Sequence, residues 1–437
     1  MYVRIRRNTW VALGFAALLF LAACSSAASK IDDVKPVVDE PTPTATAAVV
    51  TEEPTATEPV KENPTPTATV TEPETESERG ILTEDDRSTR LKSVTQSWNT
   101  NWNKHIIDYS ELLSGGPPRD GIPSIDDPQF VSPEEASEWL ADNEPVIAFE
   151  MNGDARAYPL QILIWHEIVN DTIGDVPVIV TFCPLCNSAI TFDRRLGEQV
   201  YEFGTSGLLR NSDLVMYDRT SESLWQQLTG EAIVGDLVGE QLTFLPSAIV
   251  SFADFRQAYP EGIVLSRDTG HVRSYGQNPY VGYDTIGQSP FLYNGEEDPR
   301  LPAMERVVAV SLGEIDVAYP LSVLSEVHVI NDTQADQDLV VFHAAGTSSA
   351  LGAGIIAEAD DVGATGVFDP NLDGQKLTFR WTDGEIVDEQ TESTWSVLGQ
   401  AMDGPLAGKS LTPIIHADHF WFAWAAFKPD TIIYRAE

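Results

Sequence analysis

The sequence predicts a strand-rich α+β protein in which one module occurs twice in tandem, the second copy being degenerate. Short apolar runs bounded by turn residues, such as residues 178–182, predict strands. Helical stretches near residues 160–169 and 252–259 supply the α part. The third observation is an internal similarity, because residues 146–172 and 307–333 align without a gap.

An ordered series of shared motifs indicates the duplication. The run AYPL at residues 157–160 recurs at 318–321, and NDT at 170–172 recurs at 331–333. Further along, Trp225 corresponds to Trp395, and a Gly-x-Leu-x-Gly turn follows each tryptophan. Residues present in both copies are expected to maintain the fold, whereas reactive residues present in one copy only are candidates for function.

The elements of the first copy are expected in a definite order. The turn Asn152-Gly153 predicts a β-hairpin, followed by one or two helical turns. Strands follow at residues 178–182 and 190–192, with further short strands beyond them. A helix near residues 252–259 ends at Pro260, after which residues 263–265 form a last strand.

The N-terminal segment predicts export and a lipid anchor. Three arginines precede an apolar run that is too short for a comfortable membrane span but suits a signal peptide. It ends Leu21-Ala22-Ala23-Cys24, which resembles a bacterial lipobox and implies cleavage of residues 1–23 and acylation of Cys24. We therefore expect an extracytoplasmic, membrane-anchored lipoprotein.

Composition sets the remaining boundaries. Residues 24–80 are rich in Thr, Pro and Glu and predict a disordered spacer. We expect an extension packed on the first module, the first module, an irregular connector and the second module, at residues 81–130, 131–268, 269–300 and 301–437.

Charge and cysteine content exclude some classes of function. The chain has 67 acidic and 27 basic residues, a net charge of −40, which argues against a nucleic-acid partner. Residues 1–80 hold 12 acidic and 7 basic residues, so 55 and 20 remain and the rest of the chain carries −35. Three cysteines exclude a disulfide-stapled scaffold. No phosphate-binding glycine loop, Gly-x-Ser-x-Gly elbow or His-Glu-x-x-His helix occurs.

The first candidate for chemistry is the pair Cys183 and Cys186, in a CPLC turn between two predicted strands. Two thiols at this spacing chelate one ion or close a small disulfide. The second copy lacks the pair, although His343 falls beside the position of the first thiol. His166 precedes the pair by one hairpin, and the second copy has no histidine at the matching position.

The second candidate is a polar stretch that the second copy largely lacks. Arg210, Asn211, Ser212 and Asp213, together with Trp165, are expected to line a pocket that binds a cofactor or ligand.

These stretches resemble the DUF3179 family of bacterial and archaeal proteins. The resemblance rests on WHEIVNDTIGDVPVIVTFCPLCNSAITFDRR at residues 165–195, SGLLRNSDLVMYDRTSESLWQQLTGEAIVG at 206–235 and VLSRDTGHVRSYGQNPYVGYD at 264–284. It covers nearly all of residues 100–437. It implies that CPLC and RNSD are family features of exported proteins, and it implies no established activity.

Three interpretations of the cysteine pair remain open. In the first, Cys183, Cys186 and His166 bind zinc or copper with a further ligand, Asp193 or His271. In the second, the pair is the redox site of an extracytoplasmic thiol-disulfide oxidoreductase. In the third, it is a structural disulfide in a module that binds a ligand or a protein. The membrane, through Cys24, is the only partner that the sequence indicates.

Overall fold

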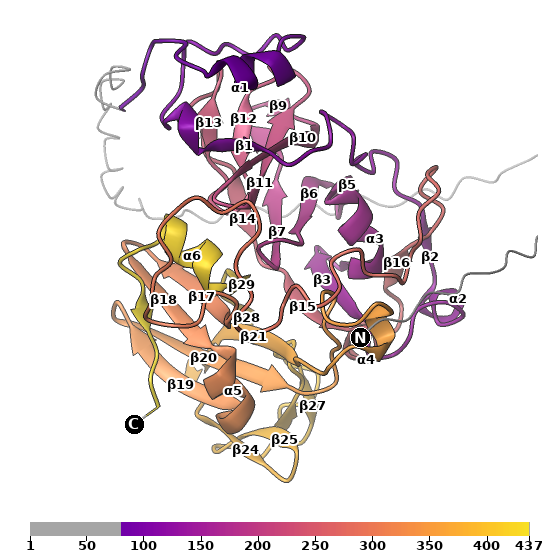
Figure 1. Ribbon diagram of the computed structural model, residues 1–437. Helices are drawn as coiled ribbons and strands as arrows, with labels where there is room; N and C mark the ends of the chain where they lie inside the picture. The colour runs from indigo at the N-terminus through magenta and orange to yellow at the C-terminus, as the bar shows by residue number, and fades with distance from the viewer. Residues whose placement is uncertain (1–79, 437) are drawn as a thin grey trace, which may run out of the picture. The chain divides into compact units, whose positions relative to one another are not determined.

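The computed structural model describes residues 80–436, whose helices and strands are labelled in Figure 1. The predicted signal peptide, Cys24 and all but the last residue of the predicted spacer lie outside these residues. Thirty short strands and six short α-helices alternate along the described part of the chain, which confirms the strand-rich α+β class. Within this part, no helix combines the length and the apolar character that a membrane span requires.

Three sheets, in which most strand pairs are antiparallel, make up the first half. Their strand orders are β15-β3-β4-β16-β2, β14-β7-β6-β5 and β1-β10-β11-β12-β13. The bounds of the strands are β1 Leu112–Ser114, β2 Phe130–Val131, β3 Pro145–Met151, β4 Asp154–Pro159, β5 Ile168–Ile173, β6 Val176–Cys183, β7 Ser188–Asp193, β10 Phe203–Arg210, β11 Asp213–Asp218, β12 Leu224–Gln226, β13 Ala232–Val234, β14 Thr243–Leu245, β15 Ala248–Ser251 and β16 Ile263–Leu265. A small hairpin, β8 Arg195–Leu196 with β9 Gln199–Val200, and the helices α1 Thr89–Val94, α2 Pro133–Ala136, α3 Leu160–His166 and α4 Phe252–Ala258 complete it, with a 3-10 turn at Tyr109–Glu111.

Local sequence explains the first elements. Asn152 and Gly153 have φ angles of 54° and 84°, the left-handed conformation that a two-residue hairpin turn requires, and they join β3 to β4 as predicted. Pro159 then starts α3, whose seven residues make two helical turns. The predicted helix end at Pro260 and the last strand are also confirmed, as α4 and β16.

The second half repeats this order of elements. Its sheets are β29-β17-β18-β30, β19-β20-β21-β28 and β24-β25-β26-β27. The bounds are β17 Arg306–Leu312, β18 Ile315–Pro320, α5 Leu321–Val327, β19 Val329–Gln334, β20 Gln337–Ala344, β21 Ala364–Asp369, β22 Asn371–Leu372, β23 Gln375–Lys376, β24 Phe379–Thr382, β25 Glu385–Asp388, β26 Thr394–Trp395, β27 Ala401–Asp403, β28 Thr412–Pro413, β29 His416–Phe420, α6 Trp421–Phe427 and β30 Ile432–Ile433, with a 3-10 turn at Ile356–Glu358. In the first half β6 pairs with β5 on one side and β7 on the other, and in the second half β20 pairs with β19 and β21 in the same way. The origin of this similarity by duplication stays a prediction.

The residues that both halves share have the same hydrogen-bond partners. Asn170 bridges to the backbone N–H and C=O of Phe203 at 2.9 and 2.8 Å, and Asn331 bridges to Phe379 at the same distances. These bonds tie β5 to β10 and β19 to β24. The shared asparagines therefore hold neighbouring sheets together.

A buried aspartate organises the turn before each shared tryptophan. Asp218 is fully buried and accepts hydrogen bonds from the backbone of Thr220, Ser221 and Ser223, from the Ser221 hydroxyl, and from Trp225 Nε1 at 3.1 Å. In the second half, Asp388 accepts from Trp395 Nε1 at 3.0 Å in the same way. The shared tryptophan is thus a hydrogen-bond donor as well as a core side chain.

The extension and the connector add strands and aromatic side chains to this framework. β1 pairs with β10, and β2 pairs with β16, so residues before the first module complete two of its sheets. Among the described residues, no helix or strand lies between β16 and β17. The connector there packs Tyr275, Tyr280, Tyr283 and Tyr293 against the largest core cluster, which contains residues of both halves.

We predict that Asp218→Ala destabilises the protein strongly. The substitution leaves several buried donors without an acceptor, each at a cost of about 1–3 kcal/mol, so we expect the free energy of unfolding to fall by at least about 3 kcal/mol. Urea denaturation measures this change. Glu198→Ala, at an exposed position, is the control and should stay within about 0.5 kcal/mol of the wild type. Equal stability of the two variants would contradict the role given to Asp218.

Candidate functional site

The two cysteines lie at a tight turn between β6 and β7. Cys183 is the last residue of β6 and pairs with Ser188, the first residue of β7. The backbone N–H of Cys186 donates to the carbonyl of Cys183 at 3.2 Å, and Asn187 closes the turn with φ of 51°. The strand resumes directly, as the sequence predicted, so no helix begins at the thiol pair.

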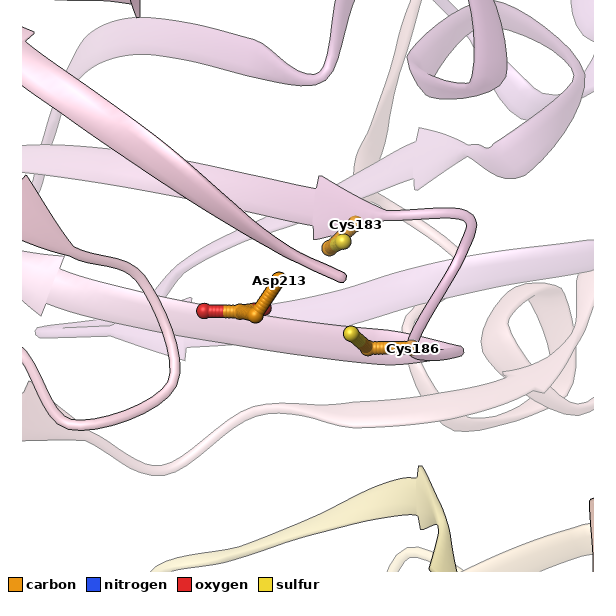
Figure 2. Close-up of side chains that lie close together, drawn as sticks. All are labelled: Cys183, Cys186 and Asp213. Carbon is orange, nitrogen blue, oxygen red and sulfur yellow. The ribbon is translucent and has the colours of Figure 1, made fainter. Parts of the chain in front are cut away.

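A second hairpin brings Asp213 to the cysteines. Asn211 and Ser212 are the two turn residues between β10 and β11, with φ angles of 51° and 70°, and Asp213 is the first residue of β11. One ligand atom from each of Cys183, Cys186 and Asp213 lies within 4.8 Å of the others. Figure 2 shows these three side chains gathered at the turn.

The group is buried among polar atoms that lack partners. Cys183 is 2% exposed, and Cys186 and Asp213 are fully buried. Asp213 Oδ2 accepts hydrogen bonds from Gln226 Nε2 at 2.5 Å and from the Leu228 backbone at 3.0 Å, but no nitrogen or oxygen donates to Oδ1. Ser188 Oγ, Gln226 Oε1 and Gln227 Oε1 also have no partner. Unpaired buried acceptors of this kind are costly, and a cation or a proton near them offsets the cost.

Glu167 adds a second buried carboxyl group to this region. It caps α3 in the left-handed conformation, with φ of 59°, and is 9% exposed. Burial, followed by the charge of Asp213, raises the pKa of Glu167 to about 8. Burial also raises the pKa of Asp213 to about 6, although hydrogen bonds to its carboxylate partly offset the effect. Each group is therefore easier to protonate than an ordinary carboxyl.

Burial acts on the thiols in the same direction. It raises the pKa of Cys183, and the charges of Asp213 and Glu167 add to the increase. The pKa of Cys186 is raised still further, again mainly by burial. Both cysteines are free thiols. Reactive cysteines have the opposite properties, a lowered pKa and partial exposure, so this environment does not favour thiol redox chemistry.

The connector and the second half close the site. The Ser212 hydroxyl donates to the carbonyl of Phe291, and burial raises the pKa of Tyr283 and Tyr280, with smaller contributions from the charges of the site residues. The Phe420 backbone N–H donates to the Cys186 carbonyl at 2.9 Å. The site therefore depends on segments of the chain far apart in sequence.

The structure does not bring His166 into this group. Its Nδ1 lies 2.7 Å from the carbonyl of Pro123, and its Nε2 lies 2.7 Å from the hydroxyl of Tyr275, so both ring nitrogens have partners. Burial lowers its pKa to about 4. His166 is thus a neutral, hydrogen-bonded histidine, and the fourth-ligand candidate His271 is exposed beside it, with ring centroids 5.5 Å apart.

The other predicted site residues lie in different surroundings. Asp193 ends β7, five residues beyond the turn and so about 17 Å along the strand, where it forms an ion pair with Arg195. Arg210 forms an ion pair with Glu111 at 2.7 Å. Trp165 packs at the edge of the core. Of the stretch Arg210–Asp213, Asp213 brings its side chain to the cysteines, and the Ser212 carbonyl accepts a hydrogen bond from Cys183 Sγ at 3.9 Å.

Sequence reasoning missed Glu167 as a member of the region. A usable signal was present, because Glu167 follows the helix directly and occupies the place of His328 in the second copy. Reactive residue types at this position in both copies pointed to it rather than to its neighbour His166. The tyrosines of the connector carry no signal of this kind.

Comparison with known proteins gives the family. The model for "Protein of unknown function (DUF3179)" matches residues 119–431, which include both the cysteine turn and Asp213. The chain belongs to the DUF3179 family. No curated protein and no solved structure matches it. The site residues of this DUF3179 protein therefore have to be interpreted from their own geometry.

We predict that metal-free protein loses stability as the pH rises from about 4 to about 8. The folded protein holds protons on Asp213 and Glu167 at pH values where the unfolded chain, with carboxyl pKa values near 4, has released them. The free energy of unfolding should fall by up to about 1.4 kcal/mol per pH unit for each group, up to about pH 6 for Asp213 and about pH 8 for Glu167.

Urea denaturation in chelator at a series of pH values measures this slope. Asp213→Asn should flatten it below about pH 6, and Glu167→Gln up to about pH 8. The exposed Glu198→Gln control should leave it unchanged. If both variants kept the wild-type slope, the raised pKa values would be wrong.

Proposed function

We propose that this protein binds one zinc ion through Cys183, Cys186 and Asp213. The observation that carries the proposal is the convergence of two thiols and one carboxylate within 4.8 Å, with no nitrogen or oxygen donating to Oδ1 of that carboxylate in the core. Bonds of about 2.0–2.3 Å to a tetrahedral zinc ion place ligand atoms about 3.3–3.8 Å apart. The three ligand atoms lie within 4.8 Å of one another, so they need to approach by no more than about 1.5 Å to reach that spacing.

The ligand types favour zinc over copper(I). Zinc accepts thiolate sulfur together with carboxylate oxygen, whereas copper(I) selects thiolates and thioethers. A carboxylate as the third ligand is therefore better matched to zinc. Copper(I) on the two thiols alone remains an outcome that metal analysis distinguishes.

Charge balance supports the same assignment. Two thiolates and the Asp213 carboxylate carry a charge of about −3, so a divalent cation removes most of the cost of burying them. Because both thiols have raised pKa values, binding releases their protons. The fourth position is left to Glu167, whose charge acts on both Cys183 and Asp213, or to a small molecule.

The two alternatives have less support. An oxidoreductase needs an accessible thiolate, and here both thiols are buried with raised pKa values, and the pair leads into a strand and does not open a helix. A structural disulfide is compatible with the spacing of the turn, but it leaves Asp213 Oδ1 with neither a thiol donor nor a cation.

We also propose that the protein is exported and anchored by a lipid on Cys24. The support is the arginine-flanked apolar run that ends in Leu21-Ala22-Ala23-Cys24. An exported zinc site of this kind keeps its thiols reduced in an oxidising compartment, because metal-bound sulfur is protected from disulfide formation.

We predict one zinc ion per chain in protein purified under metal-replete conditions. Cys183→Ser/Cys186→Ser should lose it, and Asp213→Asn should bind zinc more than about tenfold more weakly, since a direct ligand contributes more than the outer-shell groups whose loss costs 10–100-fold. Elemental analysis and competition with a chromogenic chelator measure the two effects.

The matched control is His166→Gln, which should keep the zinc because both nitrogens of His166 already have partners. Thiol titration in denaturant with chelator should find Cys183 and Cys186 reduced. Metal-free protein with both cysteines oxidised would refute the proposal and favour the structural disulfide.

We predict that Cys24 alone carries the lipid. Cells grown with an alkyne-labelled fatty acid should yield labelled wild-type protein, because acylation follows cleavage at the lipobox. Cys24→Ala should abolish the label, whereas Cys183→Ser, the matched cysteine control, should keep it. Equal labelling of Cys24→Ala and the wild type would rule out this attachment site.

A further inference from the structure

Two histidines meet in the second half, and one of them occupies the position that Glu167 has in the first half. His328 caps α5 in the left-handed conformation, with φ of 60°, as Glu167 caps α3. The His343 backbone N–H donates to the His328 carbonyl at 2.8 Å, and the Phe182 N–H donates to the Glu167 carbonyl at the same distance. His343 therefore stands one residue before the position that matches Cys183.

The Nδ1 atoms of the two imidazole rings face each other. His328 Nδ1 and His343 Nδ1 lie 3.2 Å apart. Two nitrogen ligands of one ion, with bonds of about 2.0–2.1 Å and angles of about 90–109°, lie about 2.9–3.4 Å apart. The observed separation falls within this interval, so both atoms can bind one ion without movement of the backbone.

The contact of His343 Nε2 sets the tautomer of the ring. His343 Nε2 lies 3.4 Å from the carbonyl oxygen of Val362, which can only accept, so the proton is assigned to Nε2 and the lone pair to Nδ1. Burial lowers the pKa of His343, which keeps the ring neutral. A backbone carbonyl behind the ring is the usual outer support of a metal-binding histidine.

Packing holds both rings in place. Trp381 stacks on the His328 ring, with centroids 4.2 Å apart and planes 24° from parallel. His343 is 3% exposed. Gly363, at φ of 75°, allows the close approach, because a Cβ there would lie 2.2 Å from His343 Nε2. The pair is thus a preorganised feature and not two mobile surface side chains.

A pocket of about 390 Å³ opens onto the two histidines. Asp361 and Glu305 also line it, and so do Asp284 and Arg306, which neutralise each other in an ion pair at 3.0 Å. The Asp361 carboxylate accepts hydrogen bonds from the backbone of Gly346, Thr347 and Gly363. The remaining carboxylates make the pocket attractive to cations and leave room for water or a small ligand beside an ion.

We propose that His328 and His343 form a second metal site, which binds a divalent ion of the nickel, copper or zinc type and leaves its other coordination positions open to this pocket. Imidazole nitrogens are suitable ligands for all three ions. The site is independent of the one at Cys183, Cys186 and Asp213, since it uses other residues and other ligand atoms.

Calorimetric titration with nickel tests the proposal in full-chain protein without a histidine tag. The background is Cys183→Ser/Cys186→Ser, which removes the thiol ligands of the first site. This protein should bind one nickel ion per chain. Adding His328→Gln and His343→Gln should weaken binding at least tenfold, whereas adding His271→Gln, which removes an exposed histidine, should not change it.

Two further measurements keep the result interpretable. His343 is buried, so replacing it can affect folding. The second variant therefore carries His328→Gln alone, at a partly exposed position. It should also lose nickel, while its melting temperature in chelator stays near that of the parent. Cobalt bound to wild-type protein reports the first site separately, through a thiolate-to-cobalt charge-transfer band that the histidine variants should keep. Absence of that band alone would refute the cysteine site and not this one. Nickel binding that is absent in the parent, or unchanged in the histidine variants, would overturn the second site.

Discussion

Two thiols and a carboxylate share one buried space at the turn between β6 and β7, and their burial governs the chemistry of the first half. Cys186 and Asp213 are fully buried, and Glu167 adds a fourth acidic group nearby. Burial of several anions without a counter-ion is prohibitive, so the groups either keep their protons or share a cation. The raised pKa values of the two thiols and the two carboxyl groups correspond to the state in which the groups keep their protons. The same arrangement of ligand atoms also allows the thiols and the Asp213 carboxylate to share a cation.

The comparison of the two halves separates what holds the fold from what supplies the chemistry. Asn170 and Asn331 make equal bridges between sheets, and Asp218 and Asp388 organise equal turns. The residues that end α3 and α5 have the same left-handed backbone, yet the residue is a glutamate in one half and a histidine in the other. At this one position, the common framework thus presents a carboxyl group in one half and an imidazole in the other.

Local sequence signals predicted the hairpins correctly. They did not predict which residues surround the cysteines, because those residues come together through long-range contacts. Asn152-Gly153 has one favoured backbone conformation, and the CPLC turn lies between two apolar runs, so both could be placed from sequence alone. His166 was the nearer histidine by sequence. However, the chain leaves the helix at Glu167 in the left-handed conformation, and it is Glu167 whose charge acts on Cys183 and Asp213 while His166, the last helical residue, contacts Tyr275. Asp213 reaches the cysteines through a hairpin almost thirty residues later, a contact that no local pattern encodes.

The two proposed sites differ in access, and this difference suggests different uses for their metals. The cysteine site lies under the connector, where Ser212 is hydrogen-bonded to Phe291 and the Cys186 carbonyl is hydrogen-bonded to the Phe420 N–H. An ion therefore reaches the site only when these segments open, or during folding before they close. A site of this kind exchanges metal slowly and stabilises the fold around it, as structural zinc sites do. The histidine pair, by contrast, opens onto a pocket of about 390 Å³ and supplies only two protein ligands. An ion bound there keeps open positions, and open positions are what a metal needs in order to bind or activate a further molecule. The half without the cysteine pair is therefore the half whose proposed metal site a small molecule can reach.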